Sequence, residues 1–274
     1  MRLADIEIAL RERRDFSVLE HACLHRASLE DGMGIVRGRD RVRDAIIATR
    51  ADETDGPVRI VHDLGDMIVF ETAQGWRGHR WAAREGDRIK ALTSIDDGTA
   101  RCRAIGADPV ATARHLGESH PLHAPLGELR PGIGQMATPE TPDLPPHFPD
   151  AAVPQATALH RLWNARALDR IAAPWHGPQD ADGDGVGFVL GLIRALPDAV
   201  LLIERGLVTG DGTVALLWRL IGHHLGDCLW ANASGTRIRA IGSSVFPPKG
   251  GEEMMIDMLH VQATAFRPAI DYTC

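Results

Sequence analysis

The sequence predicts an α+β fold that occurs twice in tandem, with helices covering one face of a curved antiparallel sheet in each copy. Three observations indicate this. In each half of the 274 residues, apolar residues at helical spacing come first, and short alternating segments between glycine turns follow. A proline-rich stretch separates the halves. Gly78 and Gly86 are spaced like Gly242 and Gly250, and each pair brackets a strand and its turn, which indicates a weak internal repeat.

The first domain is expected to span residues 1–115. Apolar residues at helical spacing predict one helix at its start and another around 42–49. Strands separated by glycine turns follow at about 58–63, 67–73, 76–84 and 88–95. Because little strand length lies between Gly65 and Gly78, the sheet of this domain is expected to be the smaller of the two.

A connector at 116–152 is expected because nine of the seventeen prolines lie from Pro121 to Pro154, and prolines exclude long helices and central strands. The second domain then spans 153–274. Apolar faces predict helices near 155–173 and 188–196. Four strands are expected after them, at 200–204, 214–221, 238–246 and 254–261.

Composition excludes several classes of function. The formal net charge of -7 and the absence of a basic stripe argue against a nucleic-acid partner. No apolar run approaches the roughly 20 residues that a membrane span needs, and the acidic start predicts no export signal. The four cysteines are scattered, so no disulfide framework is expected and the chain is predicted to be cytoplasmic.

No metal site is expected. The segment 180–185 has the D-x-D-x-D-G spacing of a calcium loop, but Gly191 stands where the loop needs a bidentate glutamate. His223 and His224 are neighbours on a predicted strand, so they point to opposite faces and cannot bind one ion together. Other histidines have no ligand-like spacing.

The candidate catalytic residues are Asp257, His224 and His223. Asp257 lies in an otherwise apolar predicted strand, where burial would raise the pKa of its carboxyl group toward that of a general base working near neutrality. One of the two histidines is expected to face the same cavity and to serve as the proton donor.

Two alternatives concern the same strand. Asp257 could instead lie on an edge, where it would face water or pair with Arg237 or Arg239. His260 lies on the opposite face from Asp257 if the strand is regular.

Tryptophans are the candidate substrate-binding residues, because large rigid rings suit the walls of an apolar cavity. Trp175 and His176 lie on a turn and are expected at the pocket mouth. Trp218 and Trp230 are expected to line the cavity. Trp163 is included, although core packing alone would also explain it.

The second half resembles the SnoaL-like polyketide cyclases and predicted ester cyclases of the nuclear-transport-factor-2-like superfamily. The matching segments, in order, are Leu162–Asp169, Trp175–Pro178, Leu196–Asp198, Gly222–Gly226, Ala233–Thr236 and Ile256–Leu259 with Gln262. The resemblance implies a cone-shaped barrel in which a curved sheet wraps around helices. It also implies intramolecular aldol ring closure without a cofactor, with Asp257 as the acid/base and His224, or His223, on the histidine of the motif.

The first half resembles the superfamily faintly, through Gly38–Val42 and Gly86–Ile89 leading to Asp96 and Asp97. His79 with either aspartate could form an analogous pair. The resemblance implies a degenerate second barrel that forms an intrachain pseudo-dimer, unless the chain forms a homodimer.

The function predicted from the sequence is therefore cofactor-independent acid/base chemistry on a small apolar carbonyl compound, either intramolecular aldol cyclisation or a related isomerisation. The alternative is a small-molecule-binding protein of the same fold without catalysis. Glu253 or Met254 stands where the family usually has a tryptophan, which favours that alternative.

Overall fold

The computed structural model describes all residues except 51–55, 120–140, 168–184, 228, 250 and 268–274. The chain divides into two compact units, Met1–Asp108 and Pro109–Cys274. Each unit combines helices with one sheet, which confirms the α+β class. The first unit ends before the expected boundary at 115, because helix α5 (Pro109–Ser119) packs against helix α8 (Met258–Ala265) of the second unit.

The first unit alternates helices and strands around one sheet. Its helices are α1 (Leu3–Glu12), α2 (Val18–Ala22), α3 (Arg39–Thr49) and α4 (Gly98–Ala104). Its strands are β1 (Cys23–Asp31), β2 (Gly34–Arg37), β3 (Val58–Asp63), β4 (Met67–Thr72), β5 (Arg77–Glu85) and β6 (Arg88–Asp96). They form one sheet in the order β2-β1-β6-β5-β4-β3, and among these described strands only β1 and β6 pair in parallel.

The expectation that this sheet would be the smaller one is wrong. It has six strands, whereas the sheet described in the second unit has four. Strands β3 to β6 lie where the alternation predicted them, but β1 and β2 were missed. The sequence of β1 is largely polar, and two adjacent residues, His25 and Arg26, are exposed, so it shows little hydrophobic alternation.

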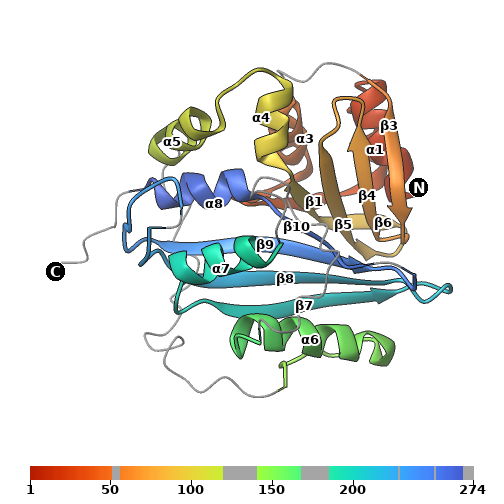
Figure 1. Cartoon of the computed structure of the whole chain (residues 1–274). Coiled ribbons are helices and arrows are strands. Elements are labelled where there is room, and N and C mark those ends of the chain that lie inside the picture. Colours follow the sequence, from red (N-terminus) through yellow and green to blue (C-terminus); the bar gives the residue numbers. More distant parts are fainter. Residues whose placement is uncertain (51–55, 120–140, 168–184, 228, 250, 268–274) are drawn as a thin grey trace. The chain divides into compact units, whose positions relative to one another are not determined.

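The second unit begins with α5 and continues, after a single 3-10 turn at Asp150–Ala152, with α6 (Val153–Asn164) and α7 (Gly185–Ala195). Its strands are β7 (Val200–Val208), β8 (Val214–His223), β9 (Arg237–Phe246) and β10 (Glu253–Ile256). They form an antiparallel sheet in the order β10-β9-β8-β7, and α8 follows the last strand. Figure 1 shows the four strands side by side, from β7 to β10.

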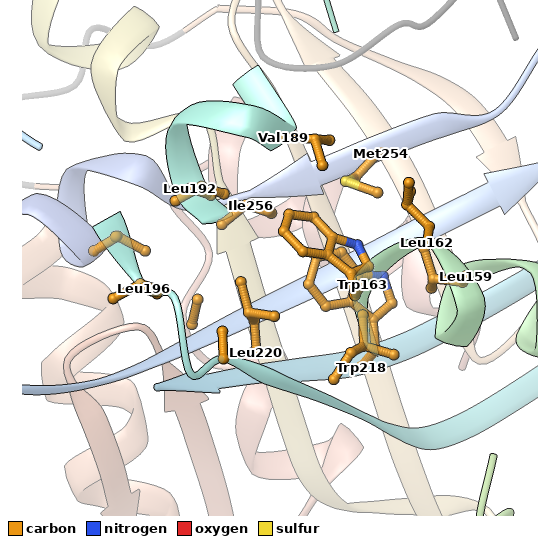
Figure 2. Close-up of a cluster of buried hydrophobic side chains, with 14 of the residues drawn as sticks. Leu159, Leu162, Trp163, Val189, Leu192, Leu196, Trp218, Leu220, Met254 and Ile256 are labelled. Carbon is orange, nitrogen blue, oxygen red and sulfur yellow. The ribbon is translucent and has the colours of Figure 1, made fainter. Parts of the chain in front are cut away.

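Alternate residues of β8 and β9 face the core of this unit, as the period of a strand requires. Trp218 and Leu220 on β8 and Ile238 and Ala240 on β9 are all buried in one cluster. Leucines of α6 and α7 and the indole of Trp163 close the cluster from the helix side (Figure 2). This helix-covered face of the sheet is where the family resemblance implies the interior of a cone.

The helix expected at 155–173 is shorter in the structure and ends at Asn164. The Asn164 amide Nδ2 donates to the Leu201 carbonyl at 3.0 Å, and its Oδ1 accepts from the Leu201 backbone nitrogen at 2.7 Å. The Asn164 side chain therefore satisfies both backbone groups of Leu201, as a residue on a neighbouring strand would, and the helix ends there beside β7. Arg166, just beyond, has a positive φ of 56°.

The strand expected at 254–261 is wrong beyond Ile256. Asp257 is the N-cap of α8, and its carboxylate accepts a hydrogen bond from the His260 backbone nitrogen. Aspartate is among the preferred N-cap residues, so this signal was present in the sequence and was outweighed by the apolar pattern.

None of the helices in the described ranges is long and apolar enough to cross a membrane.

Candidate functional site

Two indoles face each other in the core of the second unit. The ring centroids of Trp163 on α6 and Trp218 on β8 are 6.2 Å apart at an angle of 38°, and both side chains are fully buried (Figure 2). The Trp218 Nε1 donates to the Ser244 hydroxyl at 3.1 Å. The Trp163 Nε1 has no hydrogen-bond partner among the described residues. Burying an indole N–H without a partner is unfavourable, so this donor is available to a bound polar group.

Glu252 extends this polar chain and was missed by the sequence analysis. It precedes β10 and, by alternation with Met254 and Ile256, lies on the core side of the sheet. Burial raises the pKa of its carboxyl group to about 7, although a hydrogen bond with Ser244 opposes the shift. Its Oε1 is buried and finds no hydrogen-bond partner within the described parts of the chain. A carboxyl group with such a pKa can exchange a proton near neutrality.

The pH dependence of stability tests this environment. Because the pKa of Glu252 is raised in the folded state, its contribution to stability is present below the pKa of an unfolded glutamate, about 4, and is lost as the pH rises through about 7. Glu252→Gln cannot ionise. Thermal unfolding of both proteins should therefore show the wild type losing stability relative to the variant between about pH 4 and 7. A difference in melting temperature that stays constant over this range would contradict a buried Glu252 carboxyl.

The two neighbouring histidines separate as the strand period predicted. His223 is exposed on the surface, where its Nδ1 lies 2.6 Å from Asp198 Oδ2 and its backbone nitrogen donates to Asp198 Oδ1 at 2.7 Å. Burial raises the pKa of Asp198, but the hydrogen bonds from His223 outweigh this and lower it. His223 thus holds the 196–198 turn against the end of β8, and the pairing gives it a structural role.

His224 points inward and is fully buried. Its Nδ1 lies 3.0 Å from the Ser234 hydroxyl, and its backbone exchanges hydrogen bonds with Thr236 and Gly235. Burial lowers the pKa of the imidazole, so the ring is neutral near pH 7. Its Nε2 has no hydrogen-bond partner in the described part of the structure. A neutral imidazole can donate or accept a proton at this atom, depending on its tautomer.

Asp257 is buried, as the sequence analysis required, but its carboxylate is occupied locally. Oδ1 accepts from the His260 backbone nitrogen at 3.3 Å, and Oδ2 lies 2.7 Å from His260 Nδ1. The expectation that His260 would face away from Asp257 is wrong, because residues three apart on a helix lie on the same face. The result is an aspartate–histidine pair at the start of α8.

The sheet register keeps these groups apart. His224 bonds with Thr236, whereas β10 ends where Ile256 pairs with Gly242. The stretch of chain from Thr236 to Gly242 covers about 20 Å at the usual rise of a strand. Glu252 lies still further along, beside Ser244. No described hydrogen bond or ion pair joins His224 to Asp257 or Glu252. The described structure therefore has three separate polar groups, where the sequence analysis expected one acid–base pair.

Of the remaining candidate substrate-binding residues, Trp230 lies in the described part of the chain. Trp230 is 36% exposed, and its backbone nitrogen donates to Gln262 Oε1 at 2.7 Å. It therefore lies at the surface of a loop that α8 holds. Trp175 and His176 lie outside the described residues. In the described ranges, no group of three or more His, Cys, Asp or Glu side chains has a metal-binding arrangement.

In the first unit, Asp96 and Asp97 take two different roles. Asp97 caps α4, accepting from the Ala100 backbone nitrogen at 3.0 Å. Asp96 binds Arg80, with Oδ1 2.6 Å from Nη1. His79 is fully buried, but it neighbours Arg80 on β5 and points to the opposite face. By strand alternation His79 faces away from Asp96, and its pairing with either aspartate stays a prediction. Asp97 matches Asp257 as an N-cap after the last strand of its unit.

Among the solved structures similar to parts of this chain are SnoaL-like and nuclear-transport-factor-2-like proteins. A candidate polyketide cyclase from Acidithiobacillus ferrooxidans is 26% identical over 42% of this chain and 94% of its own, with a TM-score of 0.35. A candidate SnoaL-like polyketide cyclase from Jannaschia sp. CCS1 is 24% identical over 30% of this chain and 60% of its own, with a TM-score of 0.27. TsrD from Streptomyces laurentii is 22% identical over 43% of this chain and 99% of its own, with a TM-score of 0.34. No protein-family model and no curated protein matches the chain.

Proposed function

We propose that the second unit catalyses cofactor-independent proton transfer on a small apolar carbonyl compound, as an intramolecular aldol cyclisation or a related isomerisation. The observation that carries the proposal is the half-buried Glu252, whose carboxyl Oε1 is buried and which is linked through Ser244 to the paired indoles. Removing a proton next to a carbonyl needs a base whose pKa is near the working pH.

The surroundings of Glu252 suit this chemistry. Trp218 donates to the Ser244 oxygen, and the serine hydroxyl hydrogen can donate in turn to the Glu252 carboxyl group. Trp163 supplies an indole N–H that could donate to the oxygen of a substrate, where negative charge develops as the proton leaves. Apolar walls around these groups keep the effective dielectric constant low, which strengthens both interactions.

The residues chosen from the sequence remain the rival assignment. Asp257 would be the base and His224 the donor, with His223 as the alternative donor. His224 keeps an inward-facing neutral imidazole that fits a donor role. Asp257 would need to release His260 before it could act on a substrate, because both of its oxygens are engaged. Trp163, Trp218, Trp175, His176 and Trp230 are retained as proposed substrate contacts.

The assignment is tested by exchange of α-protons for deuterium in a panel of apolar ketones and aryl keto esters, followed by NMR in D2O. Glu252→Gln should slow the exchange about 100-fold, the lower range for loss of a general base. Glu253→Gln is the matched control, because this neighbouring glutamate alternates to the other face of the sheet and should leave the rate unchanged.

Further variants distinguish the assignment of Glu252 as the base from the rival assignment of Asp257. Asp257→Asn keeps the helix cap, since asparagine caps as well as aspartate, so a loss of rate there would not come from a lost cap. Loss of exchange in Asp257→Asn and His224→Gln, with Glu252→Gln active, would move the base to Asp257. If no compound exchanges but an apolar ligand quenches the tryptophan fluorescence, the non-catalytic binding protein is the better description.

We also propose that the predicted domains 1–115 and 153–274, joined by a linker at 116–152, are tandem copies of a cone-shaped barrel, with residues 109–119 packing in the second unit. The support is a shared ending, in which a strand is followed by an aspartate N-cap and a helix, at Asp97 and at Asp257. Such copies could form an intrachain pseudo-dimer or leave the chain to form a homodimer. Light scattering at several concentrations distinguishes the two.

A further inference from the structure

A hollow in the first unit lies at the ends of several elements, away from the groups considered above. It measures about 480 Å³, including the part open to solvent. The described residues that line it are Leu10, Arg11, Arg14, Phe16, Arg50, Gly56, Val58, Thr72, Gln74, Trp76 and Ile105. Three of these are arginines, about half are apolar, and none is a carboxylate.

The deeper arginines are held in fixed orientations. The Arg11 guanidinium lies 4.6 Å from the centroid of Phe70 and 4.5 Å from that of Trp76, while its Nε bonds with Glu7 Oε1 at 2.5 Å. Arg50 Nη2 lies 3.2 Å from the same Glu7 oxygen. Because packing and an ion pair restrain these side chains, a bound anion would not have to order them, which lowers the entropic cost of binding.

The third arginine lies at the rim. Arg14 is exposed, just after the end of α1, and Gln74 is exposed on the turn between β4 and β5. Leu10, Phe16 and Trp76 supply apolar surface to the same hollow. Guanidinium groups match the planar, two-oxygen geometry of a carboxylate, and apolar walls suit a hydrocarbon body.

We propose that this hollow binds a small organic monocarboxylate, with its carboxylate on the arginines and its apolar body against Trp76 and Phe16. The proposal concerns the first unit only and does not depend on the chemistry proposed for the second. It gives the first unit a ligand of its own, in place of the purely structural role that a degenerate copy would have.

Isothermal titration calorimetry of the whole chain with sodium benzoate tests this site, with benzamide as the uncharged analogue of the same shape. Benzoate should bind, and benzamide should bind about tenfold more weakly or not at all, because hydrogen bonds to a charged acceptor are roughly twice as strong as neutral ones. The affinity for benzoate should fall as the salt concentration rises.

Two variants at exposed positions test the location without disturbing the buried charges. Arg14→Gln removes a cation at the rim, and Gln74→Glu adds an anion there, so each should weaken benzoate about tenfold. Arg13→Gln is the matched control, because Arg13 is also exposed but does not line the hollow.

Four results would overturn the proposal. These are no measurable heat with millimolar benzoate, equal affinity for benzamide, equal weakening by Arg13→Gln and Arg14→Gln, and tighter binding of phenyl phosphate than of benzoate. The last would show that the arginines select a phosphate rather than a carboxylate.

Discussion

Replacing Glu7 by glutamine is expected to destabilise the first unit by about 3–5 kcal/mol, the usual cost of removing one partner from a buried ion pair. Glu7 is 3% exposed and lies within 2.5 Å of Arg11, 3.2 Å of Arg50 and 3.5 Å of Arg80. Glutamine keeps the shape but not the charge. Asp96, which binds Arg80, would remain as a carboxylate partner in this cluster.

The pH dependence of the same variant follows from the pKa of Glu7. Burial alone would raise this pKa, but Arg80, Arg50 and Arg11 outweigh burial and hold it well below its usual range. A depressed pKa stabilises the folded state above the pKa of an unfolded glutamate and loses that contribution as the pH falls through the folded value. The stability difference between wild type and Glu7→Gln should therefore shrink below about pH 4.

Urea unfolding at pH 7 and at pH 3 measures both effects. Glu85→Gln is the control, because Glu85 pairs with Arg26 on the surface at 2.6 Å, where an ion pair contributes about 1 kcal/mol or less. A cost at Glu7 no larger than the cost at Glu85 would show that the buried arginines do not depend on Glu7.

Strand positions were predictable where one face is buried and the other is not. Strands β8 and β9 alternate cleanly because their core side meets the helices, and their predicted bounds agree with the structure to within a few residues. Strand β1 could not be recognised in the same way, because its sequence, CLHRASLED, is mostly polar and pairs at long range with β6. Pairing partners that are distant in sequence leave no local signal.

The site could be predicted only in part, because the chemical environment of a side chain depends on elements that are far apart in sequence. The family-like segments do converge: Asp198 binds His223, and Ser234 binds His224. These two contacts hold the end of β8 and the loop that follows it. Glu252 carries no motif, and its raised pKa arises from burial and from Ser244 on the neighbouring strand. Asp257 was located correctly as buried, but its neighbour His260 depends on a helix that the apolar pattern concealed.

Replacing Gly242 by valine is expected to destabilise the second unit by about 3 kcal/mol, at the upper end for overpacking a core. Gly242 pairs with Trp218 across β8 and β9, and a Cβ atom at this position would overlap the Trp218 indole. The ring is fully buried against Trp163, so it cannot swing into solvent. Moving the ring would also break the hydrogen bond from its Nε1 to Ser244, which orients the Glu252 carboxyl.

Gly191→Ala provides the contrast, because a Cβ atom on this residue of helix α7 meets no atom within 4 Å. Alanine there should stabilise the protein by up to about 1 kcal/mol, since glycine is the poorer helix former. Urea unfolding followed by tryptophan fluorescence compares the two variants. The fluorescence of folded Gly242→Val should also differ from that of the wild type, because the environment of Trp218 changes. Equal stabilities for Gly242→Val and the wild type would mean that the indole does not pack on β9, and the path from Trp218 through Ser244 to Glu252 would then lose its structural basis.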